Sequence, residues 1–375
     1  MSHPHRGAYY YIRNYLKDRK QSVVINNCKS STRDVLSGVP QGSILGPSLF
    51  LLFLNDMTQG LSPGTQVCMY ADDTKIWREI HGENDHIILQ QDIDYLMDWA
   101  LRNKMNFHPS KCKALMVSHN KPPLADILPE IQFYYKMGNS IIDYCDSEKD
   151  LGVNINCTLN WTSHCDTVYS KANQMFGLLK RICHFVNNTN MKRSLYLSLV
   201  RSQFEHCPIV WKPSSITAIK KLENIQKRSF KWILGDDNIS YSSDLLYHIH
   251  CKQLNILPIK FRLDLHDLKF FHSVVYNLSC VKLPQYLQPF SGSRLRTSHL
   301  DHKCYVSNVF PRNPQSNRNF TNSYFYRAHL AWNRLPLQIR DIEIQSEFKT
   351  ALINYLWNEI SAIDRHSIGS DDDVT

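Results

Sequence analysis

The chain has 375 residues, of which 43% are hydrophobic and 21% charged, the ordinary composition of a folded protein. This length predicts two or three domains. No run approaches the roughly 18 apolar residues of a membrane span. The first twenty residues also lack the apolar stretch of a secretory signal. We therefore expect an intracellular protein, in the nucleus or the cytoplasm, with no membrane partner.

The net charge of +9 is unevenly distributed along the chain. Residues 151–260 hold 14 Lys or Arg against 6 Asp or Glu. Such a concentration of positive charge suits a polyanion, although a basic solvated face without a partner would have the same composition.

The 11 cysteines are an odd number without a CxxC pair, which favours free thiols over a disulfide framework. Four of them adjoin a histidine, as in His164-Cys165 and His206-Cys207. Neighbouring side chains rarely converge on one metal ion, so packing cysteines are the better interpretation than a structural zinc site.

The elements predicted for the first third alternate between helix and strand. Residues 7–19 predict a helix and 21–27 a strand, followed by a loop rich in Gly and Pro. The apolar run at 48–57 predicts a buried helix. Residues 66–77, QVCMYADDTKIW, predict a β-hairpin with two aspartates at or beside its tip.

Residues 84–103 follow as an amphipathic helix, and 113–118 as a strand. The apolar face of that helix is formed by Leu89, Ile93, Leu96, Met97 and Ala100. This order of elements predicts an α+β fold, an antiparallel sheet with helices on one face.

The rest of the chain is predicted to be mainly helical. Three prolines at 121–130 mark a break, and strands are expected near 131–156. Helices are then expected at 163–182, 190–207 and 215–235, with a further helical region from 236 to 359 and an acidic tail after it.

The adjacent carboxylates of Asp72 and Asp73 repel each other unless a cation lies between them. Mg²⁺ prefers oxygen ligands of this kind. Asp pairs are also common in solvated turns, because Asp tolerates turn geometry. These twelve residues alone leave both interpretations open.

Longer segments resemble one known family. SGVPQGSILGPSLFLLFLNDM at 37–57, followed by YADDTKIW, resembles the reverse transcriptase of non-LTR (LINE-type) retrotransposons of the jockey and CR1 kind. WALRNKMNFHPSKCKALMVS at 99–118, EKDLGVNINCTLNW at 148–161 and AWNRLPLQI at 331–339 resemble further segments of the same elements. These five blocks are colinear and span nearly the whole chain.

The resemblance implies a partial polymerase palm followed by a helical thumb and C-terminal region. The implied domains are a partial palm at 1–118, the end of the palm with a primer-grip-like hairpin at 119–158, a thumb-like region at 159–235, a helical C-terminal region at 236–365 and a disordered acidic tail at 366–375.

It also implies an RNA-directed DNA polymerase that acts on an RNA template, a DNA primer and deoxynucleoside triphosphates. Two Mg²⁺ ions, or Mn²⁺, would support nucleotidyl transfer. The implied catalytic residues are Asp72 and Asp73, which are also the metal ligands, and Lys111. The implied template and substrate contacts are Ser37, Gly38, Pro40, Gln41, Gly42, Tyr70, Ala71 and Asn106, and the implied primer grip is Leu151 and Gly152.

One expected part of the family's site has no counterpart here. Family palms carry a third carboxylate several tens of residues before SGVPQG, but only 36 residues precede Ser37, and Asp18 and Asp34 lie in unrelated contexts. We therefore expect the chain to begin just after that residue and to be inactive as it stands.

Two other functions compete with this interpretation. A non-catalytic nucleic-acid-binding protein derived from a reverse transcriptase would use the basic helices alone. A viral RNA-dependent RNA polymerase also presents an Asp pair on a hairpin, but Tyr70-Ala71 and the SGVPQGSILGP block disfavour it.

Overall fold

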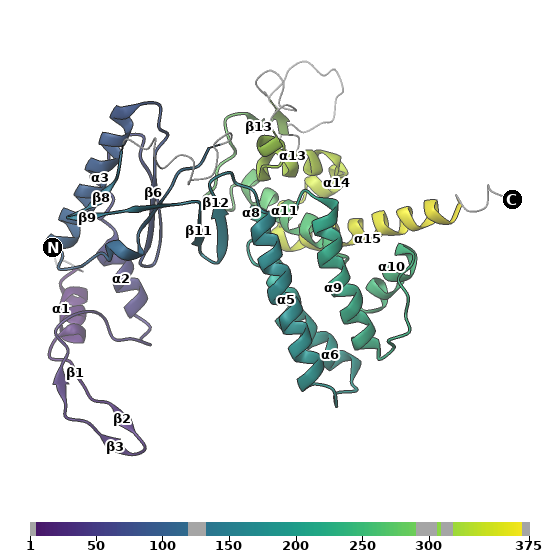
Figure 1. Ribbon diagram of the computed structural model, residues 1–375, viewed down its shortest axis with the longest axis horizontal. Coiled ribbons are helices and arrows are strands. Elements are labelled where there is room, and N and C mark those ends of the chain that lie inside the picture. The colour runs from purple at the N-terminus through teal and green to yellow at the C-terminus, as the bar shows by residue number, and fades with distance from the viewer. Residues whose placement is uncertain (1–4, 119–132, 290–305, 309–317, 370–375) are drawn as a thin grey trace. The chain divides into compact units, whose positions relative to one another are not determined.

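The structure is a computed structural model that describes residues 5–118, 133–289, 306–308 and 318–369 (Figure 1). The chain divides into two compact units. The first unit comprises residues 1–114 and 125–144, and the second 115–124 and 145–375. The α+β class is confirmed: helices are combined with short strands, and every strand pair whose register the structure gives is antiparallel.

In its described residues the first unit combines three helices with short strands. Its elements are α1 (His5–Leu16), β1 (Lys20–Gln21), β2 (Val24–Ile25), β3 (Cys28–Lys29), β4 (Arg33–Asp34), α2 (Gly46–Leu54), β5 (Gln66–Tyr70), β6 (Asp73–Trp77), α3 (Glu83–Arg102), the 3₁₀ turn η1 (Pro109–Lys111), β7 (Lys113–Leu115), β8 (Lys136–Met137), β9 (Ser140–Ile141) and β10 (Asp143–Cys145). The strands form two-stranded sheets, in the pairs β1–β4, β2–β3, β5–β6, β7–β10 and β8–β9.

The core of the first unit is formed where α2 and α3 meet the β5–β6 hairpin. Leu54 and Met57 pack with Leu96, Trp99 and Ala100. The predicted face of α3 is confirmed, because Ile93, Leu96 and Ala100 are buried and Leu89 and Met97 are half-buried.

The prediction that the apolar run at 48–57 is a buried helix is wrong in its second part. The helix forms, but Leu51, Leu52 and Phe53 are 57%, 67% and 43% exposed. Only one face of α2 reaches the core, through Phe50 and Leu54. A run that is apolar on every side cannot bury all of its surface against a core on one side.

The second unit is mainly helical. Its elements are β11 (Ser147–Asp150), β12 (Val153–Asn156), α5 (Thr162–Ile182), α6 (Thr189–Leu195), the π-helical turn η3 (Tyr196–Arg201), α7 (Ser202–Glu205), α8 (Pro208–Trp211), α9 (Ile216–Leu234), α10 (Asp244–Gln253), α11 (Ile259–Val275), β13 (Leu287–Pro289), β14 (Val306–Asn308), α12 (Arg318–Thr321), α13 (Tyr324–Arg334), α14 (Leu337–Arg340) and α15 (Gln345–Gly369).

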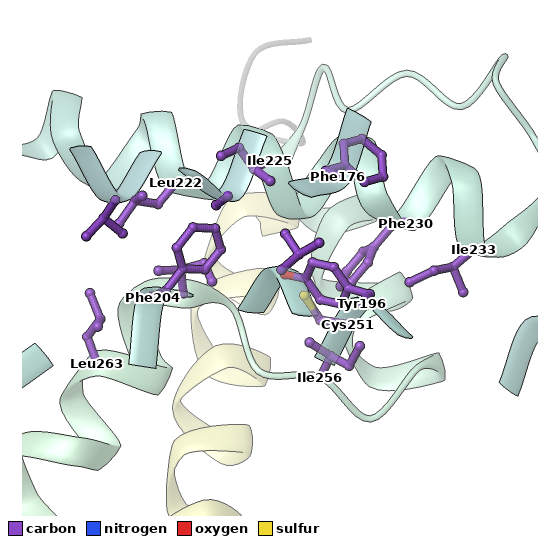
Figure 2. Packing of buried hydrophobic residues seen from close by; sticks show 14 of the residues in the cluster. Phe176, Tyr196, Phe204, Leu222, Ile225, Phe230, Ile233, Cys251, Ile256 and Leu263 are labelled. Atoms are coloured by element: carbon purple, nitrogen blue, oxygen red, sulfur yellow. The ribbon is translucent and has the colours of Figure 1, made fainter. Parts of the chain in front are cut away.

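Large side chains from α5 to α11 fill the main core of this unit. Phe176, Tyr196, Phe204 and Phe230 lie together in the cluster shown in Figure 2, and all are at most 4% exposed. A second cluster joins α11, α13 and α15 around Trp332. The helices predicted at 163–182 and 215–235 are therefore confirmed, and 190–207 is helical with a π-helical turn inside it.

Two predictions for the last part of the chain are corrected. The region 236–359 is not purely helical, because β13 pairs with β14 in antiparallel register. The tail expected to be disordered from 366 overlaps α15, which continues to Gly369. Residues 370–375 lie outside the described residues, as does the predicted break at 121–130.

All ten cysteines in the described part of the chain are free thiols, as expected. None of its helices is both long and apolar enough to cross a membrane.

Candidate active site

The aspartate pair lies in the hairpin of β5 and β6. The register pairs Tyr70 with Asp73, so Ala71 and Asp72 form a two-residue turn. Ala71 has φ of 52°, in the left-handed region that side chains disfavour. The predicted hairpin is thus confirmed, with Asp72 in its turn and Asp73 as the first residue of β6.

The two faces of the hairpin have different environments. Val67, Met69, Thr74 and Ile76 are half-buried, and Met69 and Ile76 pack on the cluster of α2 and α3. The other face, with Tyr70 and Asp73, is exposed. Tyr70 itself is 66% exposed. The alternation of a half-buried strand therefore directs Asp73 away from the core, and Asp72 is also exposed.

The SGVPQG segment forms a turn-rich loop just before α2. Gly38 and Gly42 have φ of 74° and 76°, a conformation that glycine adopts without steric cost. Arg19 Nη2 donates to the carbonyl oxygens of Ser37 and Gly38, at 3.1 and 2.5 Å. Gln41 is exposed. The loop therefore presents Gln41 to solvent while Arg19 fixes the backbone at its start.

The end of this loop leads directly into α2. Ser43 Oγ donates to the Pro40 carbonyl oxygen at 2.7 Å and accepts from the Gly46 amide at 3.1 Å. A Cβ at Gly46 would lie 2.8 Å from Ser43 Oγ. A larger residue at Gly46 would therefore disturb the hydrogen bonds that join the loop to the helix.

The segment after α3 carries the other two implied site residues of this unit. Met105 and Phe107 pack on the core, while Asn106 and Lys111 are exposed. Lys111 ends the 3₁₀ turn η1. Neither the Asn106 nor the Lys111 side chain bonds to another residue that the structure describes, so both are available to a ligand.

One hydrophobic cluster holds all three segments. Phe50 and Leu54 of α2, Met69 and Ile76 of the hairpin, and Met105 and Phe107 belong to it. The SGVPQG loop, the Asp pair and Asn106 are therefore attached to the same core. No group of three or more His, Cys, Asp or Glu suited to a metal ion occurs among the described residues, so Asp72 and Asp73 stand as a pair.

Two carboxylates are a partial fit for the divalent ions that the family implies. Mg²⁺ usually keeps several waters and binds through one or two carboxylates together with phosphate oxygens of a substrate. The exposed pair has the right chemistry for a metal–triphosphate complex. It supplies fewer ligands than a site made wholly of protein groups would need.

The implied primer grip, Leu151 and Gly152, lies in the second unit. These residues form the turn between β11 and β12, with Asp150 paired to Val153. Their φ angles are 45° and 90°. His206 Nε2 donates to the Leu151 carbonyl oxygen at 2.8 Å, and a Cβ at Gly152 would lie 2.9 Å from the same nitrogen.

A second histidine fixes the strand that follows this turn. The Asn154 amide donates to His164 Nδ1 at 3.2 Å. The His164 ring meets Trp211 edge to face, and Trp211 Nε1 donates to the His206 carbonyl oxygen at 2.8 Å. Burial, with smaller contributions from Lys171 and His206, lowers the pKa of His164 to about 4. The neutral ring that accepts from Asn154 is thus the stable form at neutral pH.

Two residues that hold these loops were not predicted from the sequence. Arg19 fixes the SGVPQG loop, but its sequence neighbours, KDRK at 17–20, do not distinguish it from an ordinary surface arginine. His206 was noted only as the neighbour of Cys207. Its role depends on a contact with a residue 55 positions away, which no local pattern indicates.

Comparisons with known proteins find one similar family. Residues 1–161, which include the loop, the Asp pair, Asn106, Lys111 and the Leu151-Gly152 turn, match the family described as "Reverse transcriptase (RNA-dependent DNA polymerase)". Over this region the chain is similar to the reverse transcriptases.

Similar curated proteins include RNA-directed DNA polymerases from mobile elements and transposons. The RNA-directed DNA polymerase from mobile element jockey of Drosophila funebris is 23% identical over 235 residues, which cover 60% of this chain and 25% of that protein. The probable RNA-directed DNA polymerases from transposon X-element and transposon BS of Drosophila melanogaster are each 24% identical, over 60% of this chain. The chain spans about a quarter of the length of these relatives. No solved structure matches it.

Proposed function

We propose that Asp72 and Asp73 bind the divalent cations of an RNA-directed DNA polymerase site, with an RNA template, a DNA primer and deoxynucleoside triphosphates as its partners. The observation that supports this most directly is the shared hydrophobic cluster beneath the Asp hairpin, the SGVPQG loop and the Asn106 segment. These three segments also lie in the region that matches the reverse transcriptase family.

Each residue has a role that follows from its chemistry. Asp72 and Asp73 would hold Mg²⁺ or Mn²⁺, which polarises phosphoryl oxygens and lowers the pKa of the attacking hydroxyl. Gln41 and its flanking glycines would contact the template and the incoming nucleotide, since a backbone without side chains permits close approach. Lys111 would neutralise charge on the triphosphate. Tyr70 and Ala71 lie next to the carboxylates, where the primer end would be placed.

The primer would be held by the other hairpin. The Leu151-Gly152 turn is fixed to the helical part of its unit by His206, which gives it a defined backbone shape. A fixed turn can position a flexible ligand at a lower entropic cost than a mobile one. The basic helices of the second unit would contact the duplex backbone through phosphates.

Binding of a metal–nucleotide complex tests the Asp pair without requiring turnover. We expect Mn²⁺ to bind the chain in the presence of dTTP, and the double substitution Asp72→Asn with Asp73→Asn to weaken this binding at least tenfold. Asp98→Asn removes an exposed acid of α3 and is the matched control, which should bind like the wild type. Equal Mn²⁺·dTTP affinity of the double variant and the wild type would refute the proposed metal site.

Activity is a separate matter, because the described residues offer only a pair of carboxylates. We expect the 375-residue chain to extend oligo(dT) on poly(rA) negligibly with either Mg²⁺ or Mn²⁺. Robust synthesis that disappears in the Asp72→Asn, Asp73→Asn variant would show that two carboxylates suffice.

A further inference from the structure

The corner that joins α5 to α6 exposes a cluster of apolar side chains. Leu178, Ile182, Phe185 and Met191 are 39%, 58%, 71% and 53% exposed. Leu178 and Ile182 are four residues apart on α5 and therefore share one face of the helix. Four exposed apolar side chains in one corner of the chain favour a contact site.

This corner projects beyond the neighbouring helix. α5 and α9 run parallel, because Lys221 pairs with Asp166 and Arg228 with Asn173, each across 55 residues of sequence. The same offset places Leu234, the last residue of α9, level with Leu179. The residues from Lys180 to Phe185 therefore extend past the end of α9, at the end of α5 remote from α8 (Figure 1).

The charge around the corner is positive. Between Asp166 and Glu205 the sequence contains no acidic residue and six cations, Lys171, Lys180, Arg181, Lys192, Arg193 and Arg201. The last three are engaged inside the unit: Lys192 and Arg193 bind backbone carbonyl oxygens, and Arg201 pairs with Glu205.

Lys180 and Arg181 are different, because both are exposed and neither pairs with an acidic group that the structure describes. Asp236 and Asp237 follow the end of α9, and the Asp236 carboxylate accepts from the Asn238 amide at 2.9 Å instead of pairing with either cation. Lys180 and Arg181 thus keep their charge available at the corner.

We propose that this corner, Leu178–Met191, binds single-stranded nucleic acid. Phe185 stacks on an unpaired base, and Lys180 and Arg181 contact the flanking phosphates. Every nucleotide offers both a flat π-face and an anion, which is the combination that an exposed ring beside free cations fits. The His184 ring meets Phe185 edge to face at 5.6 Å, so it does not lie stacked over the Phe185 ring.

This inference deepens the proposed function by giving its nucleic-acid partner a second contact, but it does not depend on the Asp pair. It concerns residues outside the region that matches the reverse transcriptase family. Failure of Mn²⁺·dTTP binding would refute the metal site but not the binding of nucleic acid at the corner. Failure of dT20 binding at the corner would likewise leave the proposed metal site standing.

Anisotropy titrations of the full chain with fluorescein-labelled dT20 test the stacking. We expect Phe185→Ala to weaken binding about tenfold, the typical worth of one stacked base, and Phe185→Trp to retain it. Ile216→Ala is the control: Ile216 is 72% exposed but begins α9, near the opposite end of α5. Phe185 and Ile216 are both exposed, and far-UV circular dichroism would verify that each variant is folded.

Salt dependence tests the phosphate contacts. The double substitution Lys180→Gln with Arg181→Gln should lower the slope of log K against log salt by about 1.4, since each phosphate contact to a single strand contributes about 0.7. Lys221→Gln removes a cation already paired with Asp166 and should change the slope less.

Three results would overturn the proposal. Phe185→Ala could bind dT20 like the wild type, or Ile216→Ala could lose as much affinity as Phe185→Ala. In the third result, Phe185→Ala abolishes self-association of the chain but leaves its affinity for dT20 unchanged. The last result would assign the corner to contact with a second copy of the chain.

Discussion

The two units bury their apolar residues to very different extents. Among the described residues, the clusters of the first unit contain five and three buried apolar side chains, and those of the second unit 21 and 12. In the first unit Leu51, Leu52 and Phe53 of α2 remain exposed, whereas Phe230 and Ile233 of α9 are at most 1% exposed. Because burial of apolar area is the main source of stability, the second unit has the larger share of it.

The two hairpin turns show a second contrast. Both have two residues, and both include a non-glycine residue with positive φ, Ala71 in one and Leu151 in the other. The Leu151-Gly152 turn is held by His206, while Ala71 and Asp72 are exposed. One turn has a shape fixed by packing, and the other leaves its carboxylates accessible to ions and nucleotides.

Acid should destabilise the second unit more than the first. Burial lowers the pKa of His164 to about 4, and it also lowers the pKa values of His250, His272 and His329, all in the second unit. An unfolded histidine titrates near pH 6.5, so between these values the unfolded state binds more protons. The contribution of these neutral histidines to the free energy of unfolding is therefore fully present above about pH 6.5 and is lost as the pH falls toward 4. For His164 this loss is at most about 3 kcal/mol.

Hydrogen exchange resolved by segment would measure this effect. From pH 7 to pH 5, corrected for intrinsic exchange rates, protection of α5 and α9 should fall more than that of α3. His164→Gln should flatten the dependence for α5. If α3 lost protection first, the buried histidines would not be the groups that control acid stability.

Local patterns were sufficient wherever one segment determines its own structure. The face of α3 follows from apolar residues at helical spacing, and the β5–β6 hairpin follows from strand residues on both sides of Ala71-Asp72. The burial of α2 could not be predicted in this way, because the sequence does not show how many sides of an apolar helix will be covered.

The site shows the same limit. The resemblance predicts Gln41, Asp72 and Lys111 as site residues, and the structure attaches their segments to one core. It did not identify Arg19 or His206, because each acts through a contact between residues far apart in sequence. The pairing of β13 with β14 was also missed, since strands of three residues carry almost no periodic signal.

Gly152→Ala should destabilise the second unit by about 1–3 kcal/mol. Two causes are expected: strain in the backbone, and displacement of His206 from the Leu151 carbonyl oxygen. The added Cβ would meet His206 Nε2 at 2.9 Å while φ is 90°. Gly177→Ala is the matched control in α5: its Cβ would meet nothing within 4 Å, and alanine should stabilise the helix by about 0.5–1 kcal/mol. Urea unfolding at pH 7.5 would measure both changes.

A double-mutant cycle separates the steric cause from the conformational one. If Gly152→Ala acts through His206, the combination with His206→Ala should cost less than the sum of the two single changes. Strictly additive losses would mean that the positive φ alone makes glycine necessary and that His206 does not clamp the turn.

The smallest effect is expected at the exposed turn. Ala71 has φ of 52° and is exposed, so Ala71→Gly removes strain without removing a buried contact. We expect a gain of up to about 1 kcal/mol, reduced by the greater freedom of glycine in the unfolded chain. Slower exchange of the β5 and β6 amides would report it. If Ala71→Gly instead loosened the hairpin, the alanine side chain would be holding the turn, and the contrast between a clamped and an accessible turn would no longer stand.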